Sequence, residues 1–233
     1  MKPIHRNSLF AAIAATVVSA GVLFPATDAE AASFNGQSEL TFDTSNANGE
    51  FDQFSSRGVY LGQSPAPKYT IQDVTQSLYG NYSANVNEND IFELGEITHW
   101  NGRTVVNTTP NNLDYVVNYN FNDPNAQDTA FTFNVNYADG ASNNADSYFI
   151  DGVLTSNETV TINGKTYALQ LVGFGDDLND INLSIDTGGL YSNTYWGVYG
   201  RFVEAPVSIP TPVAASLGLV SLASLAFRRK RKS

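Results

Sequence analysis

Apolar and polar residues alternate along two stretches in the middle of the chain. In residues 115–121 (YVVNYNF) every second position carries Tyr, Val or Phe, and residues 131–137 (FTFNVNY) repeat the pattern with Thr and Asn between. Alternation with a period of two places the apolar side chains on one face of a β-strand and the polar ones on the other. Both stretches are therefore predicted to be strands with one buried face.

Other stretches have the same character, and none between residues 32 and 206 shows the period of an amphipathic helix. Further strands are predicted at residues 38–42, 58–62, 91–99, 147–154, 159–162, 166–174 and 195–203. Asn163-Gly164 separates two alternating runs and favours a type I′ hairpin turn, because both central residues need positive φ. Residues 43–56 and 62–70 are predicted to be loops. The pattern predicts an all-β fold, an antiparallel β-sandwich of jelly-roll-like type.

The first 31 residues have the three parts of a secretory signal peptide. Lys2 and Arg6 precede an apolar run at residues 9–24, and Ala-Glu-Ala at residues 29–31 supplies small residues for cleavage. A retained membrane anchor is the alternative, but the small residues follow a helix-breaking proline promptly, which favours cleavage. Residues 1–31 are therefore predicted to direct export and to be removed.

The chain ends on a second membrane-seeking segment, residues 207–233. Its apolar stretch at residues 213–227 runs directly into the basic tail at residues 228–232. The stretch is shorter than the roughly 20 residues of a standard spanning helix, although arginine side chains that reach outward extend it. Because basic residues stay on the cytoplasmic side, residues 32–206 are predicted to form an ectodomain on the other side.

Charge and cysteine content limit the classes of partner and of chemical site that this ectodomain can have. Between Ala32 and Val207 the sequence has five basic and 21 acidic residues, a formal net charge of −16. Such a surface repels nucleic acid and anionic lipid headgroups, so both are excluded, whereas divalent cations and neutral sugars are favoured. The chain has no cysteine, which excludes disulfides, thiol nucleophiles and thiolate metal sites.

Residues 92–101 (FELGEITHWN) contain His99, the one histidine of the predicted ectodomain. Glu93 and Glu96 are three apart in a predicted strand, so we expect them on opposite faces, which does not suit a pair of glycosidase carboxyls. No nucleophile motif accompanies His99, so a hydrolase would need a distant Ser, Thr or carboxylate within hydrogen-bond reach of it. One histidine without cysteine fills a zinc site only with the help of carboxylates.

Oxygen-rich segments at residues 122–128, 139–146 and 175–182 offer a calcium alternative, because calcium takes six to eight oxygen ligands. The same residue types are those that β-turns prefer, and the turn interpretation is favoured over a bound ion. The candidate calcium ligands are Asp139, Asp146, Asp176, Asp177 and Asp180.

Large aromatic residues near both ends of the predicted fold offer a sugar-binding alternative. Trp100, Trp196, Tyr195 and Tyr199 are able to stack on sugar rings if they lie on an exposed face. Large aromatic residues in strands more often belong to the core, and this interpretation is favoured for both tryptophans. Exposure of the two indole rings distinguishes the alternatives.

The C-terminal segment resembles a PEP-CTERM sorting signal, with a proline-bearing motif, an apolar stretch and a basic cluster. The motif here is Ile209-Pro210-Thr211-Pro212, where the usual sequence is Pro-Glu-Pro. The resemblance implies processing near this motif by an exosortase-type enzyme, an inner-membrane intermediate, and export in bacteria that make extracellular polysaccharide.

The middle of the chain resembles the THxN family of PEP-CTERM proteins, and is similar to the related choice-of-anchor K ectodomain. FELGEITHWN followed by TVTINGKTYALQLVGF carries the resemblance, which covers about residues 90–230. It implies a surface or matrix protein of unknown biochemical activity and assigns no catalytic residue. The favoured interpretation is a non-enzymatic protein; the alternatives are a carbohydrate-binding module, a calcium-dependent adhesin or a hydrolase. Within the family motif Thr98, His99 and Asn101 are expected to hydrogen-bond nearby backbone at a strand end, and Trp100 to pack on the sandwich.

Overall fold

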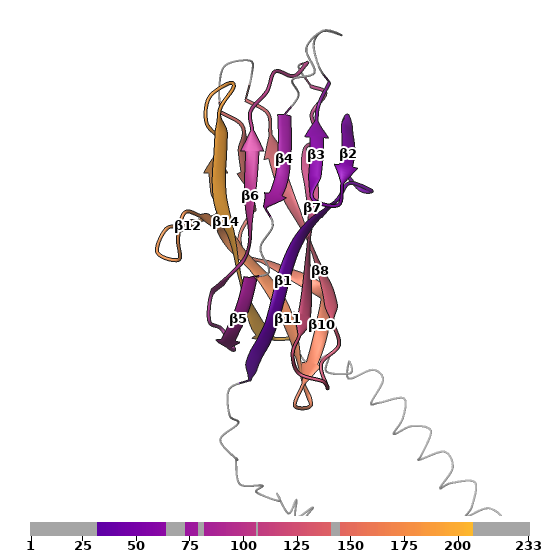
Figure 1. Cartoon of the computed structure of the whole chain (residues 1–233), viewed down its shortest axis with the longest axis vertical. Coiled ribbons are helices and arrows are strands. Elements are labelled where there is room, and N and C mark those ends of the chain that lie inside the picture. Colours follow the sequence, from indigo (N-terminus) through magenta and orange to yellow (C-terminus); the bar gives the residue numbers. More distant parts are fainter. Residues whose placement is uncertain (1–31, 64–72, 79–81, 106, 141–144, 207–233) are drawn as a thin grey trace, which may run out of the picture. The chain divides into compact units, whose positions relative to one another are not determined.

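The computed structural model describes most of the predicted ectodomain. The described stretches are residues 32–63, 73–78, 82–105, 107–140 and 145–206. Within them every regular element is a β-strand and every pairing is antiparallel. This confirms the all-β prediction (Figure 1).

Several predictions lie outside the described residues. They are the signal peptide at residues 1–31, the sorting motif at residues 209–212, the membrane helix at residues 213–227 and the basic tail at residues 228–232. In the part of the chain that the structure describes, no helix has the length and apolarity needed to cross a membrane.

The described strands form two sheets. The six-stranded sheet has the order β13-β9-β8-β7-β1-β5. Its strands are β1 (Ser33–Asp43), β5 (Tyr82–Asn87), β7 (Asn112–Phe121), β8 (Thr129–Ala138), β9 (Ser147–Phe149) and β13 (Ser184–Asp186).

The eight-stranded sheet has the order β10-β11-β14-β6-β4-β3-β2, with β12 paired to β11 beside this path. Its strands are β2 (Phe51–Ser55), β3 (Gly58–Leu61), β4 (Asp73–Leu78), β6 (Phe92–Trp100), β10 (Leu154–Ile162), β11 (Lys165–Gly175), β12 (Ile181–Asn182) and β14 (Asn193–Glu204).

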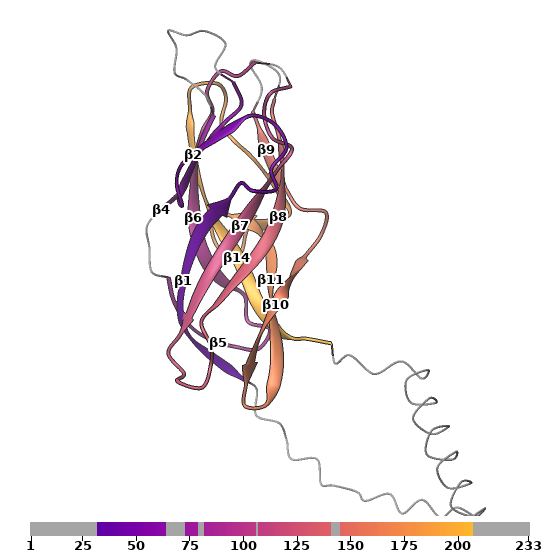
Figure 2. The same cartoon turned by 90° about the vertical axis from the view of Figure 1, so that its right-hand side faces the viewer.

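The apolar faces of the two sheets share one core. Figure 2 shows β7 and β8 of one sheet in front of β14 of the other. The alternation of β7 and β8 places Tyr115, Val117 and Tyr119 inside together with Phe131 and its alternate neighbours along β8, as the sequence predicted. Phe121, at the end of β7, packs against this core but stays partly exposed. The strand pattern read from the sequence therefore identifies the buried faces of both strands.

Phe202 is the centre of an aromatic cluster at one end of the core. Its ring stacks on Phe34 at a centroid distance of 4.2 Å and meets Tyr119 edge-on at 5.2 Å. Phe92 and Phe131 lie at 5.7 and 6.0 Å from the same ring. Because Phe34 follows the start of β1 and Phe202 precedes the end of β14, both ends of the domain lie at this end of the molecule.

Some strands were predicted incorrectly from the sequence. β2 occupies part of the predicted loop 43–56, while β4 and β5 lie where no strand was predicted. These strands have few apolar residues at alternate positions, so neighbouring strands rather than local pattern define them. The predicted strand 147–154 is divided, because the chain turns at Gly152, whose φ is 119°. The predicted hairpin is confirmed, with φ of 51° and 78° at Asn163 and Gly164.

An irregularity in β6 corrects the expectation for its two glutamates. Along β14, Val198 pairs with Gly95 whereas the next residue pairs with Glu93, so one extra residue of β6 is accommodated there. The shift restarts the alternation of inward and outward side chains, so Glu93 and Glu96 both lie half-buried on the outer face. After burial, the charges of the two glutamates are the next causes that raise the pKa of the nearby Tyr82. Bulges act in this way because they insert one residue without a cross-strand partner.

Truncation of the central aromatic ring should destabilise the fold strongly. Phe202→Ala is expected to lower the free energy of unfolding by about 3–5 kcal/mol, because it removes a fully buried ring and leaves a cavity. Urea denaturation measures the loss. Tyr195→Ala in the same strand is the control; Tyr195 is 53% exposed, and its removal should change stability by no more than about 0.5 kcal/mol. Equal losses in the two variants would contradict the assignment.

Candidate functional site

A polar cluster interrupts the apolar core at the other end of the molecule. Thr75 of β4 pairs directly with His99 of β6, and Asp73, two residues before Thr75, shares its inward face. The opposite sheet contributes Tyr137 of β8 and Tyr148 of β9, which also form a cross-strand pair. All five residues are buried. The cluster therefore spans the space between the two sheets.

His99 makes hydrogen bonds with both ring nitrogens. Nε2 lies 3.1 Å from Asp146 Oδ2, while Nδ1 lies 2.9 Å from both Thr75 Oγ1 and Tyr148 OH. An ionised carboxylate only accepts, so Nε2 carries the proton and Nδ1 accepts from a hydroxyl. Burial lowers the pKa of His99, although Asp146 opposes this shift. The imidazole is therefore neutral at pH 7.

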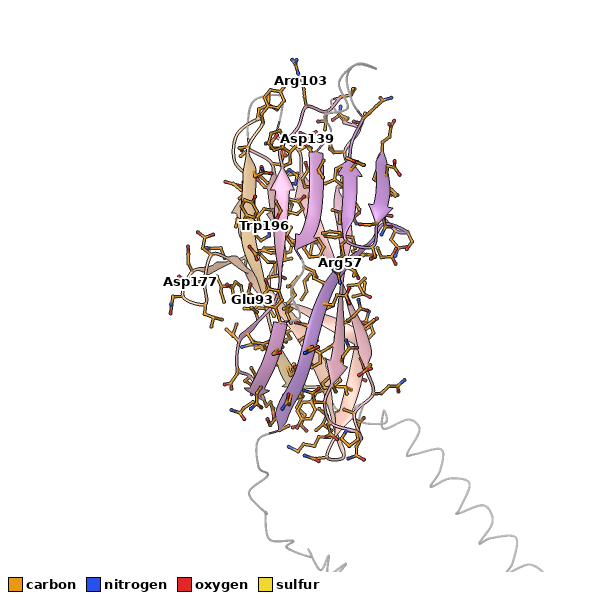
Figure 3. The ribbon with its side chains drawn as sticks, in the orientation of Figure 1. Arg57, Glu93, Arg103, Asp139, Asp177 and Trp196 are labelled. Atoms are coloured by element: carbon orange, nitrogen blue, oxygen red, sulfur yellow. The ribbon has the colours of Figure 1, made fainter. Side chains whose placement is uncertain are left out.

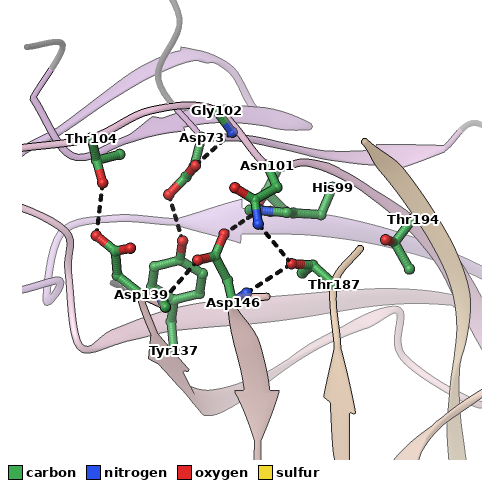
Figure 4. A network of polar contacts seen from close by, with 12 residues as sticks. Asp73, His99, Asn101, Gly102, Thr104, Tyr137, Asp139, Asp146, Thr187 and Thr194 are labelled. Carbon is green, nitrogen blue, oxygen red and sulfur yellow. Dashed lines mark hydrogen bonds and ion pairs between the residues drawn. The ribbon is translucent and has the colours of Figure 1, made fainter. Parts of the chain in front are cut away.

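Asp73 is held by one backbone and one side-chain donor. The Gly102 N–H donates to Oδ1 at 2.8 Å, and the Tyr137 hydroxyl donates to Oδ2 at 2.6 Å (Figure 4). Burial, followed by the charge of Asp146, raises the pKa of Asp73 to about 8. At neutral pH the Asp73 carboxyl therefore holds a proton for most of the time, and the cluster avoids two adjacent negative charges.

Asp146 connects the cluster to two neighbouring segments. Its Oδ1 accepts from the Gly140 N–H at 2.9 Å, and its own N–H donates to Thr187 Oγ1 at 2.9 Å. Asn101 supports the same segment, because its Nδ2 donates to the Gly188 carbonyl at 3.0 Å. Asp146 thus fixes the chain before β9 through its carboxylate and the connection from β13 to β14 through its backbone N–H.

A cleft of about 790 Å³ lies beside the cluster. Its lining is mainly amide and hydroxyl side chains, with Tyr137 and Phe149 as aromatic members. Asp139 lies in this cleft, and its Oδ2 accepts from Thr104 at 2.8 Å and Thr109 at 3.2 Å. Figure 3 shows Asp139 near the upper end of the domain, whereas Figure 2 shows β1 beginning and β14 ending toward the lower end. The cleft is therefore distal to both ends of the domain.

The segment Thr98 to Asn101 lies at the cluster, and its contacts differ in part from the expectation. His99 lies at a strand end as expected, one residue before the end of β6, but its partners are side chains from other segments instead of nearby backbone. Asn101 does bond to backbone, but at Gly188, which is distant in sequence. Thr98 Oγ1 has no partner among the described residues, and Trp100 is half-buried.

The aromatic residues considered for sugar stacking are mostly covered. Trp196 is 2% exposed and Tyr199 is 3% exposed, so neither presents an open ring face. Trp100 is partly exposed, and Tyr195 is 53% exposed. The structure therefore gives no stacking role to Trp196 or Tyr199.

The five candidate calcium ligands divide into two groups. Asp139 and Asp146 lie close together at the cleft and the cluster, and the charge of Asp146 helps to raise the pKa of Asp139 after burial. Asp176, Asp177 and Asp180 are exposed in the turn between β11 and β12. There Asp177 Oδ1 accepts from the backbone N–H two residues later at 2.6 Å, which is the local bond expected of a turn aspartate.

Thr75, His99 and Asp146 stand in the order hydroxyl, imidazole and carboxylate that a hydrolase uses. The condition set by the sequence for this alternative, a hydroxyl and a carboxylate within reach of His99, is therefore met. However, Thr75 and His99 are fully buried, and Tyr148 shares the Nδ1 atom with Thr75. A substrate carbonyl has no route to the Thr75 hydroxyl, so the arrangement does not support nucleophilic catalysis.

Thr75 and Tyr148 were not recognised from the sequence as hydrogen-bond partners of His99, nor was Asp73 recognised as a member of the cluster. The alternation of apolar and polar residues correctly predicted that Tyr137 faces the core, but nothing in the sequence around it indicated a polar neighbour there. Asp73 and Thr75 are polar residues at inward positions of β4, where sequence patterns lead one to expect apolar side chains. Only the pairing of β4 with β6 brings these residues together.

No protein-family model matches the chain, and no curated protein matches it significantly. Interpretation of the site therefore depends on the residues and their geometry.

The protonation of Asp73 predicts a particular pH dependence of stability in metal-free buffer. Unfolded Asp73 has an ordinary pKa of 3.8 and the folded residue about 8, so the folded state binds the extra proton and loses stability as pH rises between these values. The effect of His99 on stability has the opposite sign and acts only below its ordinary pKa of 6.5, since burial lowers the pKa of the folded residue. Between pH 6.5 and 8 the free energy of unfolding should fall by about 2 kcal/mol.

Urea denaturation at the two pH values measures this fall. Asp73→Asn, which keeps an acceptor for the Gly102 N–H, should remove the dependence. The same slope in the variant and in the unaltered protein would show that another group is responsible.

Proposed function

We propose that this chain is an exported, non-enzymatic protein of a bacterial cell surface or extracellular matrix, with a jelly-roll-like β-sandwich as its ectodomain. The signal-peptide pattern at residues 1–31 and the sorting segment at residues 207–233 support export and a transient inner-membrane intermediate. An exosortase-type enzyme would then process the chain near Pro210. The acidic ectodomain supports solubility outside the cell and disfavours nucleic acid as a partner.

The observation that carries this proposal is the position of the cleft relative to the two ends of the domain. The start of β1 and the end of β14 share the aromatic end, where Phe34 stacks on Phe202. Asp139 and the cleft lie at the opposite end (Figure 3). A chain attached through the segment after β14 would hold the cleft away from its attachment point, as a surface-displayed binding site requires.

The cleft supports carbohydrate as the ligand class. Its volume is within the range of about 300–1,000 Å³ typical of small-molecule sites. Asn111, Asn136 and Asp139 supply amide and carboxylate groups for sugar hydroxyls, and Phe149 adds an apolar surface. Since the ectodomain has a formal net charge of −16 between Ala32 and Val207, a neutral polysaccharide is favoured over an anionic one.

The carboxylates of the site support binding without hydrolysis. Glycosidases place two carboxyl groups on either side of the scissile bond. Among the described residues that line the cleft, Asp139 is the one carboxylate, while Asp73 and Asp146 are buried within the cluster. The same burial removes support from a hydrolase based on His99.

Native protein should lack both terminal segments if the export proposal is correct. Intact-mass measurement on material purified from the producing cells is expected to show a chain that begins near Ala32 and ends near Pro210, because signal cleavage and sorting remove the flanking segments. A mass that includes Met1 or the basic residues 228–232 would contradict this proposal.

Removal of amide side chains from the cleft should weaken polysaccharide binding. The probes are dextran and mannan as neutral polysaccharides, with alginate as the anionic comparison, in isothermal titration calorimetry. The double variant Asn111→Ala/Asn136→Ala should lose about 30-fold in affinity, because two hydrogen bonds contribute about 1 kcal/mol each. Asn120→Ala, at an exposed position near the far end of β7, is the matched control and should bind normally. The absence of binding to either neutral probe, or tighter binding of alginate, would contradict the assignment.

A further inference from the structure

Three buried side chains in the cluster each have one polar atom fixed by a group that would not itself be a ligand. Asp73 Oδ1 accepts from the Gly102 N–H, and Asp146 Oδ1 accepts from the Gly140 N–H. His99 Nδ1 is held by two hydroxyl groups. The remaining atoms are Asp73 Oδ2, Asp146 Oδ2 and His99 Nε2. One donor atom from each of the three residues lies within 4.8 Å of the others.

A fourth oxygen belongs to the same group. The Tyr137 hydroxyl lies 2.6 Å from Asp73 Oδ2, and His99 Nε2 lies 3.1 Å from Asp146 Oδ2. Neighbouring ligands of a tetrahedral ion whose bonds are about 2.0–2.2 Å long lie about 3.3–3.6 Å apart. Side-chain shifts that open the Tyr137–Asp73 pair by about 0.7–1.0 Å and the His99–Asp146 pair by about 0.2–0.5 Å would therefore convert the two hydrogen-bonded pairs into one coordination sphere.

We propose that this cluster binds one divalent transition-metal ion, zinc foremost, through Asp73, His99, Asp146 and the Tyr137 oxygen. The inference is independent of carbohydrate binding, because the ligands are buried beneath the cleft. It also differs from the calcium site considered from the sequence, since it uses His99 and Asp73 and leaves Asp139 outside.

The donor set selects the ion. Calcium takes six to eight oxygen ligands, whereas imidazole nitrogen suits zinc and its neighbours in the transition series. One nitrogen and three oxygens fill four positions, which matches tetrahedral zinc. With every position occupied by protein, the ion has no open site for water or substrate, so its role is structural.

The surroundings of the cluster resemble the outer shell of a metal site. Metal-bound carboxylates and imidazoles have their second polar atom fixed by hydrogen bonds, which set their orientation. The Gly102 and Gly140 N–H groups fix the two carboxylates, and Thr75 and Tyr148 fix the imidazole. On binding, the proton of His99 moves from Nε2 to Nδ1, where it is donated to a hydroxyl oxygen. Asp73 releases its proton to solvent, and Tyr137 binds through its neutral hydroxyl oxygen and keeps its own proton, so that two carboxylates balance the charge of the ion.

Charge balance also supports a cation. None of the residues that hydrogen-bond to Asp73, His99 or Asp146 in the described chain is Lys or Arg. Two carboxylates beside a neutral imidazole need either a proton or a cation when buried. A bound divalent ion supplies this charge without an additional side chain.

The ion would join the two sheets in a chain that has no cysteine. Asp73 and His99 belong to the eight-stranded sheet, Tyr137 belongs to the six-stranded sheet, and Asp146 directly precedes β9 of that sheet. Such a cross-link stabilises the folded state because the preformed site is absent from the unfolded chain.

Metal titration of the purified full-length protein tests the proposal. After EDTA treatment and dialysis, added zinc should bind at one ion per chain, by elemental analysis, and should raise the melting temperature. Cobalt(II) is the spectroscopic probe, because a four-coordinate cobalt site absorbs strongly in the visible region. Zinc should displace cobalt and abolish this absorption.

Substitutions locate the ion. Asp73→Asn and Tyr137→Phe should each weaken zinc binding by about 100-fold or more, since even loss of an outer hydrogen bond costs 10–100-fold. Thr75→Val, which removes only an outer bond to His99, should cost about 10-fold. Asp139→Asn is the matched control, because it removes a nearby carboxylate outside the ligand set and should bind zinc normally. Circular dichroism establishes that each variant is folded before titration.

Several outcomes would overturn the proposal. They are the absence of stoichiometric zinc, stabilisation by calcium but not zinc, or a loss of zinc binding in Asp139→Asn with normal binding in Asp73→Asn and Tyr137→Phe. Normal zinc binding by the Asn111→Ala/Asn136→Ala variant is expected, so a failure of the metal proposal and a failure of carbohydrate binding give different results.

Discussion

The hydrogen bond between His99 Nε2 and Asp146 Oδ2 connects the two sheets where neither side chain meets solvent. A buried carboxylate and a buried imidazole are costly unless their polar atoms are paired. The remaining partners meet this requirement, with hydroxyl groups at His99 Nδ1 and the Gly140 N–H at Asp146 Oδ1. Because the backbone N–H of Asp146 also donates to Thr187 Oγ1, this one residue ties its own segment both to His99 and to the connection from β13 to β14.

The core therefore has two parts with different physical origins. At the end where β1 begins and β14 ends, aromatic rings around Phe202 pack without polar partners. At the other end, hydrogen bonds of defined length and direction replace part of this apolar contact. Apolar packing tolerates several arrangements of similar volume, whereas a buried polar network is stable only when each member is satisfied. The polar end consequently defines the geometry of the cleft more strictly than apolar packing alone would.

The cleft and the cluster share a boundary but differ in chemistry. Tyr137 lines the cleft with its ring and contacts Asp73 through its hydroxyl. Asp139 is open to the cleft, whereas Asp146, seven residues later, is buried. Thr75, His99 and Asp146 resemble the groups of a catalytic triad, but their burial prevents contact with substrate. A chain of hydroxyl, imidazole and carboxylate groups thus lies beside the cleft and supports Tyr137 in its wall.

The sequence by itself determined the strand character of the domain, because alternate side chains at residues 115–121 and 131–137 face opposite sides of any extended chain. It also determined the hairpin at Asn163, where local φ preferences decide the turn. Only the tertiary structure decided the partners of His99, since Thr75 reaches it through strand pairing and Tyr148 and Asp146 through sheet packing that no local pattern encodes. The same holds for β4, whose polar inward residues become favourable only when the opposite sheet supplies their hydrogen bonds.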